Sequence, residues 1–202
     1  ERPRLLLPTP PRAPLEAIAA ALPAALATGT VACVRLDRPG AGEAELTRAA
    51  DALREICHAA EVPLVIAEHA RLVAPLGLDG VEVAFRAAPL RKLRADLGRD
   101  AILGVACGAS RHDGMTAAEA GADYVRVSPV GPVALGTAEP AGLEFFEWWA
   151  EVIETPVLAE GGLSEALARE LGPYADFAAP DAEAWEGDLA ATLRSLAAAL
   201  GD

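Results

Sequence analysis

Eight short apolar runs recur along the chain, and a stretch of helical spacing or high alanine content follows each of them. Short apolar runs of this kind are typical of strands that are buried on both faces. The predicted strands are residues 4–7, 31–36, 63–67, 80–84, 101–106, 123–128, 156–159 and 176–179. The predicted helices are residues 14–26, 44–60, 69–77, 89–98, 114–121, 141–154, 164–172 and 188–200. This alternation favours parallel strands that are joined by right-handed helical crossovers.

Eight such units close most naturally into a (β/α)8 barrel. We therefore predict an α/β fold, a single TIM barrel that forms one domain over residues 1–202. The chain is short for this fold, so its loops must be short as well. A doubly wound open sheet is the alternative, but no G-x-G-x-x-G motif follows the first predicted strand, which weakens a dinucleotide-binding interpretation.

Charge and composition restrict the partners that the chain can have. Its formal net charge of −13 argues against nucleic acid and against an anionic membrane surface. None of its apolar runs is long enough to span a bilayer. Cys33, Cys57 and Cys107 are widely spaced and show no zinc-binding pattern, which fits a reducing, cytoplasmic compartment. The one lysine, Lys92, lies in a predicted helix, whereas a Schiff-base barrel enzyme needs a lysine on a strand.

Charged residues fall where the predicted strands run into the following helices, which is where barrel enzymes carry their chemistry. Strand alternation decides which of these side chains point into the barrel. The inward set is Arg35, Asp37, Glu82 and Arg126, with Glu68 and Glu160 near the rim. Two interpretations remain open. The set forms an ion-pair network that fills the barrel, or it lines a polar pocket in which arginine binds a phosphate or carboxylate.

The stretch PVLAEGGLSEAL (156–167) is the best candidate for an anion site. Gly161 and Gly162 allow backbone N–H groups to approach a ligand, and Ser164 can cap the next helix, whose N-terminus favours negative charge. Phosphate sites of barrels recur at this place. Glu160 argues against this prediction because a carboxylate repels a phosphate. A plain glycine-rich turn is the alternative.

Three further features carry weaker predictions. His69 follows a strand end and is expected to act as a base, a metal ligand or a helix cap. Residues 112–113 (His-Asp) are expected in a solvated loop. Trp148 and Trp149 are adjacent on a predicted helix, so both cannot face the core, and one of them is a candidate for a contact in a homodimer.

Several segments together resemble the thiamin phosphate synthase/thiazole tautomerase family. They are LVIAEHARLVAPLGLDGVEVA, AILGVACG, EAGADYVRVSPVGP, PAGLE, PVLAEGGL and YADFAA, and their order and spacing match across most of the chain. The resemblance implies a (β/α)8 barrel. It also implies a transferase that joins a pyrimidine methyl diphosphate to a thiazole phosphate with magnesium and releases pyrophosphate.

Many positions that carry the family's chemistry differ in this sequence. The family's diphosphate-binding motif Gln-x-Arg-x-Lys after the second strand is replaced by VRLDRP (34–39). The motif aligns either with Val34, Leu36 and Arg38 or with Arg35, Asp37 and Pro39, and neither alignment restores its three residues. Of the two magnesium-binding Asp residues, one is replaced by Glu68 and the other by Ala87. The Thr-x-Thr-Lys after the sixth strand reads VALG (133–136).

Two further positions bear on the substrate sites that the resemblance implies. Arg126 replaces an inward small residue, so it is expected to fill the space of a substrate ring and to pair with Glu82 or another inward acid. The glycine before Pro129 is Ser128, and only the Gly161–Gly162 pair of the thiazole-phosphate site is intact.

These residues define the predicted site. The catalytic candidates are Asp37, Arg38, Glu82 and Arg126; the candidates for phosphate binding are Arg35, Ser128, Gly161, Gly162 and Ser164; and the one metal-ligand candidate is Glu68. Magnesium is implied by the resemblance alone, at an incomplete site. Catalytic activity is left open.

The predicted function is that of a thiamin phosphate synthase-like barrel protein of thiamin biosynthesis with weak or lost activity. The alternatives are a non-catalytic small-molecule-binding or scaffold protein, and a different enzyme of phosphorylated metabolites on the same barrel. The expected partner is a phosphorylated small molecule.

Overall fold

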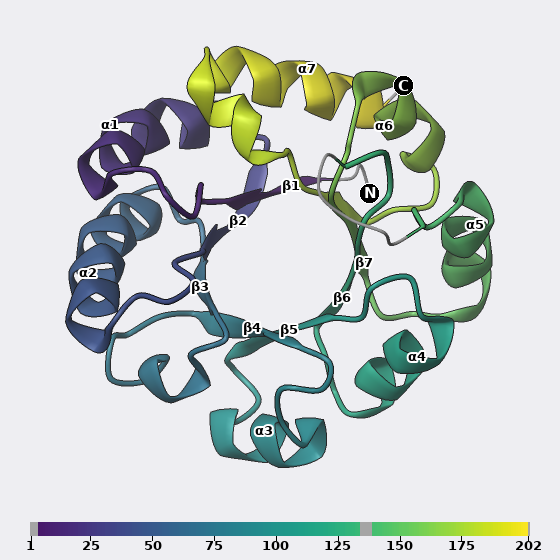
Figure 1. Cartoon of the computed structure of the whole chain (residues 1–202), viewed down its shortest axis with the longest axis horizontal. Coiled ribbons are helices and arrows are strands. Elements are labelled where there is room, and N and C mark those ends of the chain that lie inside the picture. Colours follow the sequence, from purple (N-terminus) through teal and green to yellow (C-terminus); the bar gives the residue numbers. More distant parts are fainter. Residues whose placement is uncertain (1–3, 134–138, 202) are drawn as a thin grey trace.

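The predicted barrel is confirmed. The computed structural model describes residues 4–133 and 139–201, and its eight parallel strands close in the order β1 to β8 (Figure 1). The strands are β1 (Arg4–Pro8), β2 (Val31–Leu36), β3 (Leu64–Ala67), β4 (Gly80–Ala84), β5 (Ile102–Ala106), β6 (Tyr124–Val127), β7 (Val157–Ala159) and β8 (Phe177–Ala178). Each lies within one residue of its predicted bounds at either end.

The helices form a ring around the outside of the barrel (Figure 1). The α-helices are α1 (Leu15–Leu26), α2 (Glu43–Ala59), α3 (Leu90–Leu97), α4 (Arg111–Glu119), α5 (Leu143–Val152), α6 (Glu165–Leu171) and α7 (Leu189–Gly201). Two short 3₁₀ segments complete the described elements, η1 (Ala70–Leu72) and η2 (Ala182–Glu186). Within the described ranges, no helix is long and apolar enough to cross a membrane.

Two sequence predictions about local structure were wrong. The stretch 69–77 forms only the 3₁₀ segment η1, because Pro75 lacks a backbone N–H and Gly77 takes a positive φ of 60° that ends the turn. Residues 112–113 lie in α4 and not in a loop. Ser110 begins this helix by accepting a hydrogen bond from the Asp113 backbone N–H at 3.2 Å, a cap that the sequence reading missed.

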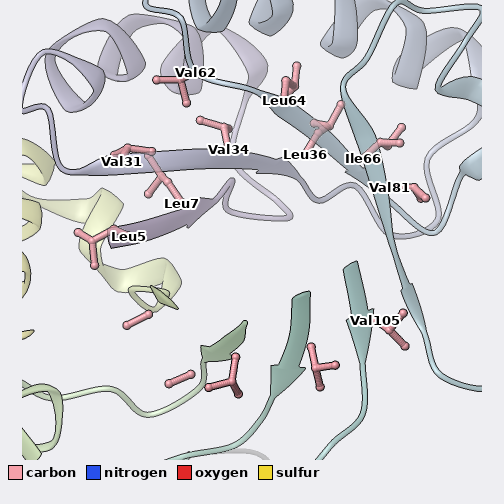
Figure 2. Close-up of a cluster of buried hydrophobic side chains, with 14 of the residues drawn as sticks. Leu5, Leu7, Val31, Val34, Leu36, Val62, Leu64, Ile66, Val81 and Val105 are labelled. Atoms are coloured by element: carbon pink, nitrogen blue, oxygen red, sulfur yellow. The ribbon is translucent and has the colours of Figure 1, made fainter. Parts of the chain in front are cut away.

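The apolar core has two layers. The larger one lies between the strands and the surrounding helices, where Leu5, Val34 and Ile66 are fully buried (Figure 2). The smaller one lies inside the barrel, where the cluster of Leu6, Tyr124 and Leu158 packs against Cys33, Ile102 and Phe177. These side chains fill the amino-terminal end of the barrel and leave the carboxyl-terminal end to polar groups.

Gly104 makes the inner layer possible. A Cβ atom at this position would lie 2.2 Å from the Tyr124 ring, so a larger residue would displace the tyrosine. Tyr124 is thereby held beneath the charged side chains described below.

The adjacent tryptophans face different surroundings. Trp149 is buried in the core, and its indole Nε1–H donates to the Thr155 carbonyl at 2.8 Å. Trp148 is only partly buried and packs under the Arg111 guanidinium, whose carbon lies 4.7 Å from the ring centroid. The structure thus gives the outward tryptophan a contact within the chain, and the homodimer stays a prediction.

An aspartate precedes three of the even-numbered strands and ties each one to the strand before it. Asp79, Asp123 and Asp176 accept hydrogen bonds from backbone N–H groups of β3, β5 and β7 at 2.7, 2.7 and 2.8 Å. The aspartate side chain thus satisfies a donor at the amino-terminal end of the barrel, where the ladder starts. This recurrence gives a structural reason for the Asp in the segments GLDGVEV, GADYV and YADFAA.

We expect Asp176→Ala to lower the free energy of unfolding by about 1–3 kcal/mol, because the Val157 N–H loses a charged acceptor. Urea denaturation at neutral pH measures this loss. Asp100→Ala is the matched control, since Asp100 is exposed and makes no side-chain hydrogen bond within the described part of the chain. Equal stability of the two variants would contradict the proposed role of the aspartate.

Candidate functional site

Arg35 lies at the centre of a buried ion-pair network inside the barrel. Its Nε and Nη2 donate to the two carboxylate oxygens of Asp37, both at 2.9 Å. Its Nη1 and Nη2 also donate to Glu160 at 2.8 and 2.9 Å, and Nη1 reaches both oxygens of Glu82 at 3.0 Å. Each guanidinium nitrogen of Arg35 therefore has at least one carboxylate acceptor.

Glu82 joins the second arginine to this network. Its Oε1 accepts from Arg126 Nε at 2.7 Å, and its Oε2 accepts from the Tyr124 hydroxyl at 2.9 Å. Glu82 is 3% exposed, and both of its oxygens accept hydrogen bonds from protein donors in this buried position. Arg126 Nη1 lies 3.4 Å from Glu160, which closes the ring of four side chains. The predicted pairing of Arg126 with Glu82 is confirmed.

The network keeps Arg35 and Glu160 charged. Burial alone would lower the pKa of Arg35, but Glu82 and Glu160 raise it well above its ordinary value. Burial would raise the pKa of Glu160, but Arg35 and Arg126 outweigh that effect and lower it. Asp37 has only one arginine partner, and its pKa is raised by burial more than Arg35 lowers it. Glu160 is thus an ionised partner at neutral pH and not a proton donor.

The sequence placed these side chains correctly but did not show how completely they satisfy one another. Arg35, Glu82 and Arg126 come from β2, β4 and β6, and alternate strands of a barrel contribute to one layer. Thr9 is not among the predicted site residues, yet it is buried and its Oγ1 accepts from the Asp37 backbone N–H at 3.0 Å. This contact positions Asp37 for its bonds to Arg35.

A cavity of ≈ 490 Å³ opens above the network at the carboxyl ends of the strands. We call it the mouth cavity. Its lining residues are Pro11, Arg35, Asp37, Arg38, Pro39, Gly40, Ala67, Glu68, His69, Glu82 and Arg126. They belong to β2, β3, β4 and β6 and to the loops that follow β1, β2 and β3. Two larger hollows lie outside the barrel, next to α1 and α2 and next to α5 and α6, and neither reaches these strand ends.

Arg38 is the least satisfied cation of the mouth cavity. It is half-buried, and its guanidinium has no hydrogen-bond or ion-pair partner within the described residues. Its Nε is fully buried without an acceptor. An unsatisfied buried donor costs about 1–3 kcal/mol, so an anion that approaches this guanidinium would gain from its free donors.

The Gly161–Gly162 turn lies outside the mouth cavity and is already occupied. The Gly162 N–H lies 3.1 Å from each carboxylate oxygen of Asp181. Ser164 begins α6 as predicted, and its Oγ accepts from the Leu167 N–H at 3.1 Å. Ser128 lies close to Gly161, because a Cβ atom on that glycine would be 2.9 Å from the Ser128 Oγ.

The residues that replace the family's magnesium ligands do not fit a metal site. Glu68 takes a positive φ of 65°, and its Oε1 accepts from the Ala84 N–H at 2.8 Å. Ala87 offers no donor, and both oxygens of Glu82 are used by Arg35, Arg126 and Tyr124. Across residues 4–133 and 139–201, no three His, Cys, Asp or Glu side chains are grouped so that they could hold a metal ion.

None of the cysteines is poised as a nucleophile. Burial is the main cause that raises the pKa of Cys33, Cys57 and Cys107 to about 12. Cys107 points back at the Val105 carbonyl, with Sγ 3.6 Å from the oxygen. The thiols therefore stay protonated at neutral pH.

Comparison with known proteins gives the lineage of this barrel. A sequence profile described as thiamine monophosphate synthase matches residues 5–174. The chain belongs to the thiamine monophosphate synthase family. A thiamine-phosphate synthase from Rhodospirillum centenum is 41% identical over 168 residues, which cover 82% of this chain and 80% of that protein. Another from Erythrobacter litoralis is 36% identical over 173 residues, 84% of this chain and 81% of that protein.

Among solved structures, the thiamine phosphate pyrophosphorylase from Pyrococcus furiosus superposes with a TM-score of 0.82. The match covers 98% of this chain and 95% of that one at 20% sequence identity. At that identity the likeness establishes the shared barrel alone. The family resemblance seen in the sequence is confirmed by the profile and by the two curated relatives.

We expect Glu82→Ala to destabilise the fold by about 3–5 kcal/mol, because it leaves two buried arginines and the Tyr124 hydroxyl without their acceptor. Denaturant unfolding measures the loss. Glu45→Ala is the control, because Glu45 is exposed and its side chain makes no hydrogen bond or ion pair within the described residues. A loss no larger than that of the control would show that the network does not stabilise the barrel.

Proposed function

We propose that this family member binds a phosphorylated small molecule in the mouth cavity and has weak or no thiamine-phosphate synthase activity. Arg38 and Arg126 take the anionic group in this proposal. Arg35, Asp37, Glu82 and Glu160 form the rigid floor beneath it. The unpartnered guanidinium of Arg38 in a cavity of ≈ 490 Å³ is the observation that carries the proposal.

The arginines differ in how many of their hydrogen-bond donors are already in use, and this difference supports the assignment. Arg35 has its donors in use by three carboxylates, so little of its hydrogen-bonding capacity is left for a ligand. Arg126 is 23% exposed, and its Nη2 has no acceptor within the described residues. Arginine binds phosphate through two parallel N–H groups. Arg38 and Arg126 therefore offer the free donors at this end of the barrel.

The same geometry supports reduced synthase activity. The curated relatives are named for a reaction in which, by the family resemblance, a diphosphate leaves with help from magnesium. Here Glu68 is bonded to the Ala84 N–H, and Ala87 replaces the second carboxylate. We infer that magnesium gives little or no assistance in this chain. The floor of the cavity is also occupied by Arg126, where the resemblance implies a substrate ring.

Several sequence predictions remain proposals. They are the roles of Ser128, Gly161, Gly162 and Ser164 in phosphate binding, the cytoplasmic location, a homodimer and the lack of a nucleic-acid partner.

Isothermal titration tests the proposal with three probes: thiazole phosphate, the pyrimidine methyl diphosphate and pyrophosphate. We expect at least one to bind the native chain. Arg38→Gln should weaken that binding by about tenfold or more, because a hydrogen bond to a charged group contributes about 1.5–3 kcal/mol. Binding should not change when magnesium is replaced by a chelator.

Arg99→Gln is the matched control, because Arg99 is exposed and makes no side-chain contact of this kind in the described part of the chain. Binding of none of the probes by the native chain, or equal affinities of the two variants, would contradict the proposal.

A further inference from the structure

The turn after β7 already binds an anion, and that anion is a side chain of the same molecule. The Gly162 N–H donates to the Asp181 carboxylate, with both oxygens at 3.1 Å. Asp181 precedes η2, but its side chain does not cap that segment. The carboxylate instead reaches across to a turn that lies 19 residues earlier in the sequence.

Backbone conformation and hydrogen bonds hold the turn in the form that presents this N–H. Gly161 and Gly162 have positive φ values of 87° and 76°, which other residues rarely adopt. The backbone N–H groups of Val130 and Gly131 both donate to the Gly161 carbonyl at 2.9 Å. A Cβ atom on Gly162 would lie 2.6 Å from the Gly131 carbonyl carbon. The turn is therefore packed against the loop after β6.

Asp181 belongs to a segment that is tied down at a second point. The Trp185 indole Nε1–H donates to the Pro8 carbonyl at the end of β1, at 3.0 Å. Residues 181–185 therefore connect the turn after β7 to the end of β1, on the side of the barrel where β7, β8 and β1 adjoin. The mouth cavity lies on the other side, since no residue of β7, β8 or η2 lines it.

The charges around the turn favour one anion and oppose a second. A phosphate monoester carries a charge of about −1.5 to −2 at neutral pH. At this turn it would meet the carboxylate of Asp181 and the negative charges of Glu160 and Glu183. Both glutamates lie near enough to raise the pKa of Asp181, although burial is the larger cause of that rise. It would also compete for the Gly162 N–H, which Asp181 already occupies.

We propose that Asp181 is a specificity-determining residue that keeps phosphate groups out of the turn after β7. The carboxylate acts as an internal competitor for the Gly162 N–H, so a phosphorylated ligand has its anion directed to the arginine side of the mouth. This role goes beyond the proposed function, because it holds for whichever molecule the mouth cavity accepts.

Phosphate titration of two variants tests this role. Asp181→Ala removes the competitor, whereas Glu183→Gln removes one nearby negative charge and leaves the Gly162 N–H occupied. The probes are inorganic phosphate and thiazole phosphate, followed by ³¹P NMR with chloride at matched ionic strength. We expect Asp181→Ala to bind phosphate about tenfold or more tightly than the native chain, as gain of a charge-assisted hydrogen bond would give. Glu183→Gln should stay near the native affinity.

The double variant Asp181→Ala with Arg38→Gln locates the added phosphate. If the gain survives in the double variant, phosphate has entered the turn after β7, and the inference holds even where the arginine site fails. A gain that disappears with Arg38 would place the phosphate at the arginines and overturn the inference while leaving the proposed function intact. An unchanged phosphate affinity of folded Asp181→Ala would also overturn it.

Asp181→Asn guards against a folding defect. The asparagine still offers an oxygen to the Gly162 N–H but carries no charge, so its gain in phosphate affinity should lie between those of Glu183→Gln and Asp181→Ala. Thermal melting and circular dichroism establish that each variant is folded. No gain in a folded Asp181→Asn, where Asp181→Ala does not fold, would contradict the role of the carboxylate charge.

Discussion

The Arg35 side chain lies inside a closed barrel with 4% of its surface exposed, and this burial constrains the groups around it. A charge taken out of water costs several kcal/mol unless its partners are well placed. Asp37, Glu82 and Glu160 supply those partners, and Arg126 in turn balances Glu82 and Glu160. The polar end of the barrel is thus a connected structure, in which removing one member leaves the others unsatisfied.

This network divides the mouth of the barrel into two unequal parts. On the side of β2 to β4, Arg38 and the cavity above the network leave donors and space for a ligand. On the side of β7, β8 and β1, Asp181 and Trp185 are bonded to the turn after β7 and to the end of β1. The chain thus keeps the barrel of its family, with Glu68 bonded to the Ala84 N–H and Asp181 bonded to the Gly162 N–H.

The sequence predicted the barrel well because each strand is an apolar run with a distinct boundary. It also placed Arg35, Glu82 and Arg126 inside, since alternation along a strand depends only on local geometry. It failed at residues 69–77, where apolar spacing suggested a helix but Pro75 and Gly77 permit only a short turn. It failed at residues 112–113, where the Ser110 cap went unnoticed.

The fine structure of the site lay beyond sequence reasoning. The contact between Asp181 and Gly162 joins two loops that meet only when the barrel closes. The hydrogen-bond donors of Arg35 are filled, whereas those of Arg38 are free within the described residues. This contrast depends on side-chain geometry, and the sequence shows only two arginines close together near the end of one strand.

The rate of pyrophosphate release tests whether the chain's own ion pairs have replaced the synthase machinery. Purified native chain is mixed with thiazole phosphate and the pyrimidine methyl diphosphate, with and without magnesium, and the Rhodospirillum centenum relative is assayed in parallel. We predict a rate far below that of an active synthase and no stimulation by magnesium. A magnesium-dependent rate comparable to an active synthase would contradict it.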